Sequence, residues 1–154
     1  ELLANEKMMF FEYLDPEDHE EYTLDLYFDH QGQMKGLVPR LRLETRGGEV
    51  SKGRTVRLAE TARLQEVFQN IQGARGCITA QVFRHKRTAR IAAIEINPRF
   101  GGGYPLSYQA GANFPRWLIK EYLLKQPIEY FNDWESNLTM LRYDGQVFVR
   151  GAAA

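Results

Sequence analysis

The sequence predicts an α+β fold, a mainly antiparallel sheet with packing helices, and three observations support this prediction. Residues 22–29 alternate strictly between apolar and polar side chains, as a strand with one buried face does. Residues 77–83 and 89–97 are two apolar runs joined by a short polar turn, which is typical of a hairpin. Residues 59–71 carry apolar side chains at helical spacing. Because short turns can only join antiparallel neighbours, the sheet should be antiparallel.

Composition indicates one domain, which we expect over residues 1–150, followed by a disordered tail at 151–154. Twenty basic residues balance twenty acidic ones, so no overall field favours nucleic acid. No apolar run reaches the roughly 18 residues that cross a membrane. The single cysteine, Cys77, favours a reducing compartment, and we expect a cytoplasmic protein. The sequence does not start with methionine, so we expect a fragment of a longer enzyme.

The N-terminal part is predicted to form strands. Residues 8–13 are a short apolar run that ends at the turn-like sequence Asp15-Pro16-Glu17-Asp18, so they predict a strand leading into a loop. The alternating strand at 22–29 should be half-buried. It should pair through a turn at Gln31-Gly32 with a return strand at 34–44.

A basic, glycine-rich stretch follows along this return strand. We expect it to be a loop that either folds over phosphates or an anionic substrate, or remains exposed with solvated charges. The sequence leaves both interpretations open. Arg40 and Arg42 should share a face of the return strand, and Arg46, Lys52 and Arg54 follow around Gly47-Gly48 and Gly53.

Two main helices are predicted, both on one side of the sheet. Residues 59–71 should form the first, with Gly73 as its C-terminal cap. The second should begin at the cap residue Asn113 and end before Pro127. A terminal hairpin over residues 137–150 should complete the domain.

Polar side chains gather at the end of the second strand of the central hairpin. Glu95 and Asn97 are two residues apart, so both should leave one face of a strand, with Ile94 and Ile96 pointing into a core on the other. Two oxygen donors on one face can share a hard cation. The turn should set Gln81 about opposite Ala92, within a register step or two of this pair.

The residues after this strand are suited to an anion. Pro98 ends the ladder, and the glycines at 101–103 allow backbone N–H groups to approach a ligand closely. Arg99 provides a cationic fork for phosphate or carboxylate. The alternative is an ordinary strand end, in which a basic neighbour satisfies Glu95 and Asn97. The combination of these groups favours a metal and phosphate site.

The run Glu95-Ile96-Asn97-Pro98-Arg99-Phe100-Gly101-Gly102, with Gln81 fourteen residues before its start, resembles the metal-binding end of an ATP-grasp domain. It is most similar to the carbamoyl-phosphate synthase large-chain branch, and the likeness continues over residues 104–123. The resemblance implies the C-terminal subdomain of an ATP-grasp fold. Gln81, Glu95 and Asn97 would hold Mg²⁺, with Mn²⁺ as an alternative ion, and would bridge it to ATP. Arg99 would be catalytic, contacting phosphate or an acyl phosphate.

The resemblance also implies nucleotide-binding residues in the N-terminal part. Glu12, Tyr13 and Leu14 would form the hinge that meets the adenine edge, and Glu21 would hold the ribose hydroxyls. Glu20, its neighbour, is an alternative for that role. Without a nucleotide, residues 12–14 would be an ordinary strand end, and the two glutamates would be solvated charges.

By this resemblance the chain is part of an ATP-dependent carboxylate–amine ligase that works through an acyl phosphate. A small-molecule carboxylate and an amine would be its substrates, and their identity stays open. The phosphate-covering subdomain of the family is expected elsewhere, on the same chain or another, so the isolated fragment should be inactive. A homo-oligomer is compatible with this interpretation; nucleic acid and membrane are not expected partners. The alternative is a non-catalytic nucleotide-responsive or assembly module, which would not need such a cluster of polar groups.

Overall fold

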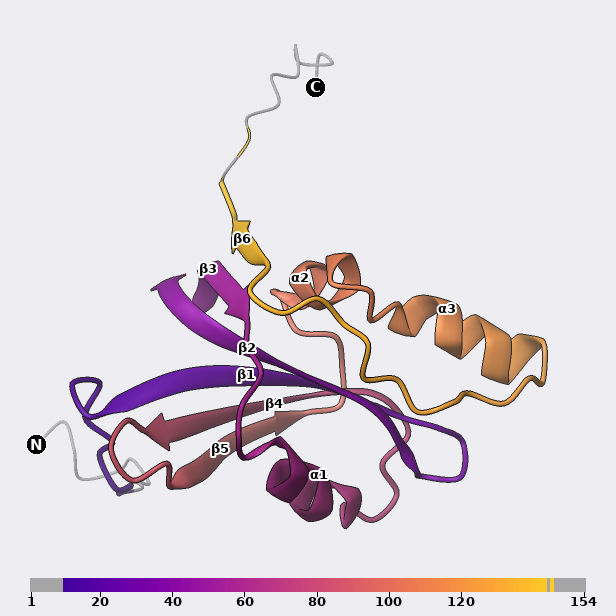
Figure 1. Cartoon of the computed structure of the whole chain (residues 1–154), viewed down its shortest axis with the longest axis horizontal. Helices are drawn as coiled ribbons and strands as arrows, with labels where there is room; N and C mark the ends of the chain where they lie inside the picture. Colours follow the sequence, from indigo (N-terminus) through magenta and orange to yellow (C-terminus); the bar gives the residue numbers. More distant parts are fainter. Residues whose placement is uncertain (1–9, 144, 146–154) are drawn as a thin grey trace, which may run out of the picture.

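The computed structural model describes residues 10–143 and residue 145. Within them the chain forms one six-stranded sheet in the order β5-β4-β1-β2-β3-β6 (Figure 1). Each pair of neighbouring strands is antiparallel, which confirms the predicted α+β fold class. The strands are β1 (His19–Phe28), β2 (Met34–Arg46), β3 (Glu49–Thr55), β4 (Gly76–His85), β5 (Ile91–Asn97) and β6 (Thr139–Leu141). The helices are α1 (Thr61–Gln69), α2 (Tyr104–Gln109) and α3 (Phe114–Leu118), which continues as the π-helix η1 (Ile119–Leu123).

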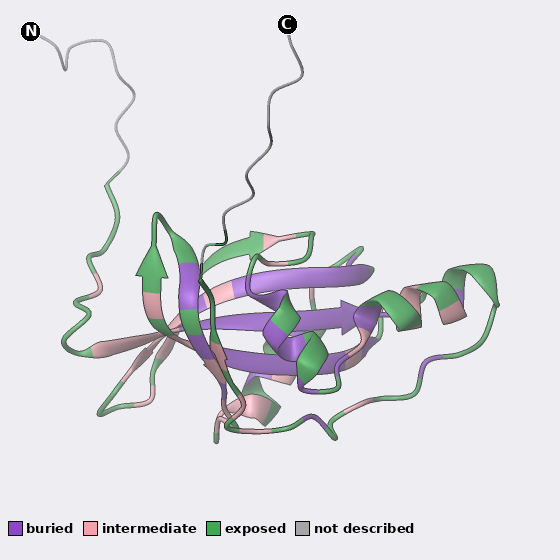
Figure 2. Ribbon diagram, turned by 90° about the horizontal axis from the view of Figure 1, so that it is seen from above, coloured by how far each residue is buried: buried purple, intermediate pink, exposed green. Residues whose placement is uncertain are grey.

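The helices cover opposite faces of the sheet, so the expectation that both main helices share one side is wrong (Figure 1). On one face, Leu64 and Phe68 of α1 pack against the alternate residues of β1 that include Leu24. On the other face, Phe114 at the start of α3 packs with Tyr27 of β1. Strand β1 is therefore buried on both faces from residue 22 onward, rather than half-buried as predicted (Figure 2). The face of β1 that carries its polar residues can be buried because these residues form hydrogen bonds and an ion pair inside the protein.

Several predicted elements need correction. The predicted loop around residues 46–54 is a hairpin, because Gly47 and Gly48 adopt positive φ angles of 56° and 81° and let β2 turn directly into β3. Residues 10–13 of the predicted first strand form no strand and lie exposed, so that prediction is wrong there, and residues 8 and 9 lie outside the described part. The short helix α2 was not predicted.

The C-terminal half agrees better with the sequence. Asn113 caps α3 by accepting a hydrogen bond from the backbone of Arg116 at 3.0 Å, as predicted. Of the predicted terminal hairpin, only β6 lies among the described residues, and it pairs with β3. Residues 144 and 146–154, which include its turn, its second strand and the predicted tail, lie outside them. No helix in the described part is long and apolar enough to cross a membrane.

The strand that carries the polar cluster lies at the edge of the sheet. Ile94 and Ile96 of β5 are 49% and 48% exposed, so the prediction that they face a core is wrong. The expected hairpin between β4 and β5 is present, but its register differs. Gln81 lies opposite Glu95 rather than Ala92, because the ladder shifts by one residue between Gln81 and Val82 and the turn lies later in the chain than predicted.

Candidate functional site

A polar pocket lies on the sheet face that carries α2 and α3, beyond the part that these helices cover. Five strands, β1 to β5, and the turn after β5 contribute to it, and it encloses about 40 Å³. Larger hollows exist elsewhere, such as one of about 390 Å³ between α1 and β5, but this pocket holds the clustered chemical groups. It is lined by Thr23, Arg40, Arg42, Gly48, Glu49, Val50, Thr79, Gln81, Asn97, Arg99 and Gly101 to Gly103.

The structure brings the three predicted metal-site residues together. Gln81 on β4 and Glu95 on β5 lie directly opposite each other, and Gln81 Nε2 donates a hydrogen bond to Glu95 Oε2 at 2.7 Å. Asn97 lies two residues further along the same strand, opposite Thr79. Its amide nitrogen is buried, and no hydrogen-bond partner for it is found within the described residues. Such a group is costly unless something satisfies it, which is typical of a binding site.

This trio fits a hard cation that is shared with a phosphate. Rotating the side-chain amides of Gln81 and Asn97 by about 180° exchanges their nitrogen and oxygen positions and turns both oxygens toward Glu95. The trio then offers one carboxylate and two amide oxygens to a cation. In the described part of the chain, no three or more His, Cys, Asp or Glu side chains are grouped so that they could hold a metal ion by themselves. Because the trio supplies a single negative charge, the remaining ligands of Mg²⁺ would have to come from phosphate oxygens and water.

A buried ion pair supports the floor of the pocket. Arg40 on β2 binds Asp25 on β1 through two contacts, Nε to Oδ2 at 2.6 Å and Nη2 to Oδ1 at 3.0 Å. Ser107 of α2 donates a third hydrogen bond to this carboxylate. Arg40 is only 1% exposed. The charge of Arg40 is therefore engaged inside the protein by Asp25.

The glycine turn rests on this ion pair. A Cβ atom on Gly103 would collide with Arg40 Nη1 and lie 2.5 Å from Val50 Cγ1. One on Gly101 would lie 3.0 Å from Thr79 Cγ2. Thr79 also donates a hydrogen bond from its hydroxyl to the carbonyl of Arg99 at 2.8 Å. The glycines thus allow the backbone to approach the protein's own side chains, whereas the sequence had suggested approach to a ligand.

Gly103→Ala should destabilise the protein by about 1–3 kcal/mol, because the new methyl group meets a fixed, buried guanidinium. Gly102→Ala is the matched control. There the new atom meets the end of the exposed Glu49 side chain, which can move away, so the change should stay within about 0.5 kcal/mol. Urea unfolding of both variants measures the difference, and equal losses would contradict the close approach at Gly103.

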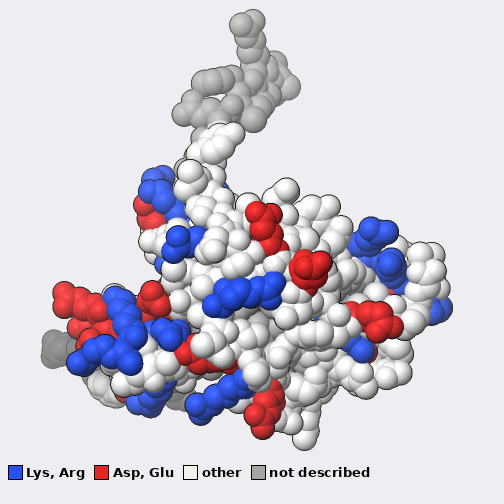
Figure 3. Space-filling view, in the orientation of Figure 1, with Lys and Arg blue, Asp and Glu red and all other residues white. Residues whose placement is uncertain are grey.

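The remaining pocket charges have distinct environments. Arg99 is exposed, and within the described residues its side chain makes one hydrogen bond, from Nη1 to the neighbouring Phe100 carbonyl at 3.1 Å, which leaves the other donors of the guanidinium for a ligand. Arg42 binds Glu21, Nε to Oε1 at 3.1 Å, and its Nη2 donates to the Gly48 carbonyl at 2.7 Å. Arg42 Nη1 also lies 3.4 Å from Gln81 Oε1. Figure 3 shows acidic and basic side chains interspersed on the face in view.

The geometry separates the two candidate ribose ligands. Glu21 pairs with Arg42 at the pocket. Glu20 accepts a hydrogen bond from the hydroxyl of Tyr22 at 2.7 Å, and Tyr22 belongs to the core under α1, on the opposite face. Of the two, only Glu21 shares the face of the pocket.

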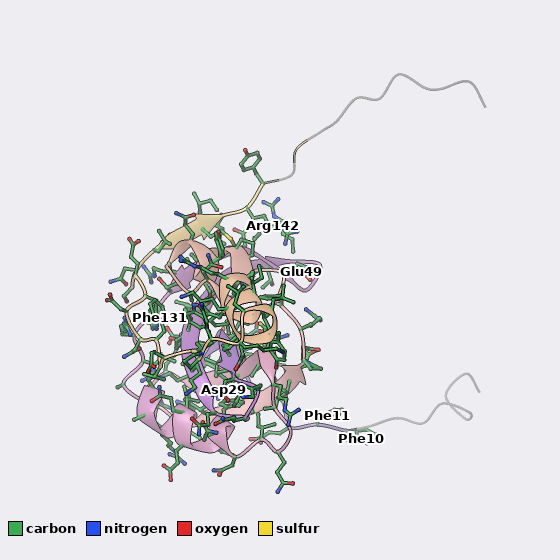
Figure 4. The ribbon with its side chains drawn as sticks, turned by 90° about the vertical axis from the view of Figure 1, so that its right-hand side faces the viewer. Phe10, Phe11, Asp29, Glu49, Phe131 and Arg142 are labelled. Atoms are coloured by element: carbon green, nitrogen blue, oxygen red, sulfur yellow. The ribbon has the colours of Figure 1, made fainter. Side chains whose placement is uncertain are left out.

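The predicted hinge residues are not brought to the pocket. Glu12 and Tyr13 are exposed and Leu14 is partly exposed, in an irregular segment before β1. Figure 4 shows Phe10 and Phe11 of this segment extending away from the sheet, while Glu49 lies at the far end near the pocket. The segment is attached to the turn between β4 and β5 through Lys86, whose ammonium donates to the carbonyls of Pro16 and Glu17.

Sequence reasoning missed the residues that hold the pocket in place, above all Asp25 and Ser107. A signal was present: the polar side of β1 carries Asp25 in mid-strand, and the paired strand carries Arg40. Opposite charges on adjacent strands of a buried sheet predict a pair. Cys77 beneath the same turn is not a nucleophile, because burial raises the pKa of its thiol and keeps it protonated.

Comparisons with known proteins show the family and the fold. A family model described as ATP-grasp in the biosynthetic pathway with Ter operon matches residues 4–145. Among solved structures, the chain is similar to a pyruvate carboxylase from Rhizobium etli, with 18% identity over 83% of this chain and 14% of that one, and a TM-score of 0.62. It is also similar to the urea carboxylase of Kluyveromyces lactis, with 13% identity over 79% of this chain and 11% of that one, and a TM-score of 0.60.

A third similar structure is the biotin carboxylase domain of 2-oxoglutarate carboxylase from Hydrogenobacter thermophilus, solved with MgADP and bicarbonate. It shares 14% identity over 79% of this chain and 28% of that one, with a TM-score of 0.60. The chain thus spans less than a third of each of these three proteins. Similarity at such identities shows the fold alone. A search of curated proteins finds no match.

Proposed function

Since the chain belongs to the ATP-grasp family of the biosynthetic pathway with Ter operon, we propose that it is the ATP- and magnesium-binding part of an ATP-dependent carboxylate–amine ligase. One observation carries the proposal: Gln81, Glu95 and Asn97 meet on one face of two paired strands, and Gln81 and Asn97 line one pocket together with Arg99. A scaffold gains nothing from collecting a carboxylate, the unsatisfied amide nitrogen of Asn97 and a guanidinium at one place.

In the proposed reaction, a carboxylate oxygen attacks the γ-phosphorus of ATP, the bond to the β–γ bridging oxygen breaks, and ADP leaves. The amine nitrogen then attacks the acyl carbon, the C–N bond forms, and the C–O bond to phosphate breaks. Inorganic phosphate leaves and the amine loses a proton. Bound Mg²⁺ would neutralise charge on the transferred phosphoryl group. Arg99 would bind the phosphoryl or acyl-phosphate oxygens with the part of its fork that the protein does not use.

Other roles follow from this proposal. Glu21 would bind the ribose, and Glu12, Tyr13 and Leu14 would reach the adenine only if their segment moves toward the pocket. Bicarbonate, the donor of a carbamoyl-phosphate synthase-like enzyme, is the first carboxylate to test. The remaining half of the ATP site, in cis or in trans, a cytoplasmic location and a homo-oligomer also belong to the proposal.

The decisive experiment uses the full-length enzyme with Mg²⁺, ATP and a panel of carboxylates that includes bicarbonate. Hydroxylamine is added, because it attacks acyl phosphates without requiring a specific amine site. We expect ADP release and hydroxamate formation with at least one carboxylate, neither of them without Mg²⁺. If ADP and ATP bind but no donor supports ADP release, the chain is instead part of a nucleotide-responsive module.

The 154-residue chain alone should release no phosphate from ATP above background. Its pocket of about 40 Å³ is far smaller than the roughly 300 Å³ or more that encloses a ligand of nucleotide size. The described residues therefore cannot exclude water from ATP, which phosphoryl transfer requires. A phosphate-release assay with Mg²⁺ tests this, and activity that Glu95→Gln abolishes would contradict it.

A further inference from the structure

A second cavity adjoins the candidate pocket and shares Glu49 and Val50 with it. It holds about 190 Å³ and is completed by Arg46, Ser51 and Arg142. This is below the roughly 300 Å³ of a typical drug-sized site, so it suits a small molecule. None of the proposed nucleotide, metal or phosphate contacts uses this cavity.

The local backbone structure brings the residues that carry these charges to the edge of the cavity. The tight turn at Gly47 and Gly48 places Arg46 directly opposite Glu49 at the end of the hairpin. The backbone N–H of Arg142, just after β6, donates to the Ser51 carbonyl at 2.8 Å, which holds this segment against β3. Figure 4 shows Glu49 and Arg142 close together at one end of the molecule.

These charges are only loosely paired with each other. Arg142 Nη1 lies 3.7 Å from Glu49 Oε2, beyond hydrogen-bond length, and the two side chains are 50% and 59% exposed. Arg46 lies 3.4 Å from Glu44, but Glu44 already binds Lys52 Nζ at 2.6 Å. The cavity thus presents one carboxylate and two guanidinium groups with spare hydrogen-bonding capacity.

The negative and positive side chains lie at different ends of the cavity, so a bound ligand would have a preferred orientation. Glu49 lies over the glycine turn, because a Cβ atom on Gly102 would collide with its carboxylate oxygen, and so it stands between the cavity and the pocket. Arg142 and Arg46 line the cavity but not the pocket. A ligand that matches both signs would place its positive end toward the pocket and its negative end away from it.

We propose that this cavity binds the amine acceptor of the reaction and that the acceptor is a free α-amino acid. Its ammonium group binds Glu49, next to the site where an acyl phosphate would form, and its carboxylate binds Arg142 with support from Arg46. The inference rests on the proposed ligase function and names its second substrate. A simple amine offers no carboxylate to either guanidinium group, so it should be a poor acceptor.

The test uses the full-length enzyme, with the carboxylate that supports hydroxamate formation as donor. The twenty L-amino acids are compared with their C-terminal amides, and product formation is followed. At least one amino acid should be an acceptor, and its amide should be about 10- to 100-fold less efficient in kcat/KM. Arg142→Gln should raise the KM for that amino acid about 10- to 100-fold and leave the KM values for ATP and hydroxylamine unchanged. Arg87→Gln, which changes an exposed arginine in the β4–β5 turn, is the matched control.

The outcomes separate this inference from the function on which it rests. If hydroxylamine yields hydroxamate but no amino acid is an acceptor, or the amides react equally well, the inference is wrong and the ligase function stands. If Arg142→Gln raises the KM for ATP as much as that for the amino acid, the cavity is not an acceptor site. If hydroxylamine yields nothing with any donor, the proposed function and the inference fail together.

Discussion

Glu95→Gln in the full-length enzyme is expected to lower turnover by roughly 10² to 10⁴, about 3 to 5 kcal/mol of transition-state stabilisation. The substitution keeps size and hydrogen-bonding capacity, so the contact with Gln81 can persist as an amide pair. It removes the single negative charge that the trio offers to Mg²⁺. Nucleotide binding should change much less than turnover, because the metal acts mainly on charge that develops during phosphoryl transfer.

Folding stability should hardly change in this variant, because Glu95 is exposed on an edge strand. Thermal melts with and without Mg²⁺, together with steady-state turnover, measure both quantities. Glu66→Gln, at an exposed position on α1, is the control and should behave as the wild type. A Glu95→Gln enzyme that is clearly destabilised but fully active would show that Glu95 holds the sheet together and does not bind a metal.

Arg40→Met is expected to cost about 3–5 kcal/mol of folding free energy, because it leaves the Asp25 carboxylate buried without its counter-charge. A loss of this size is a large part of the roughly 5–15 kcal/mol that stabilises a typical domain. Urea unfolding measures it. Arg87→Met, which removes an exposed charge, is the control and should change stability by less than about 0.5 kcal/mol.

The double substitution Asp25→Leu with Arg40→Met should recover much of this loss, because it replaces both charges with apolar groups. In the double-mutant cycle, the recovery appears as a loss in the double variant that is smaller than the sum of the two single losses. If the double variant is as unstable as the sum of the two single variants, Asp25 and Arg40 do not act as a pair. A loss below 1 kcal/mol in Arg40→Met would show that water reaches the carboxylate.

Local patterns in the sequence predicted the strand pairing and the meeting of Gln81 with Glu95 and Asn97, because strand alternation and turn residues are short-range properties. The register was missed because it depends on a bulge beside Val82 and on a turn in which Ala89 adopts a positive φ of 58°. Neither the bulge nor the positive φ at Ala89 can be recognised from the residue types alone, because both depend on how the strands pack.

The placement of the helices could not be predicted because it depends on which faces of β1 are buried. The polar residues Thr23 and Asp25 suggested a solvated face, yet they are 4% and 0% exposed. The ion pair with Arg40 and the hydrogen bond from Ser107 make this burial tolerable. The exposure of Ile94 and Ile96 was missed for the opposite reason, since apolar composition does not distinguish a central strand from one at the edge.

The two edges of the sheet differ in their ability to recruit another chain. At one edge, β6 offers three residues, too few for a stable new ladder. At the other, β5 offers seven residues with isoleucines already exposed to water, and its outer backbone groups are a template for strand addition. Within the described residues, β5 is therefore the edge that is more open to the addition of another strand, and β6 is the less open one.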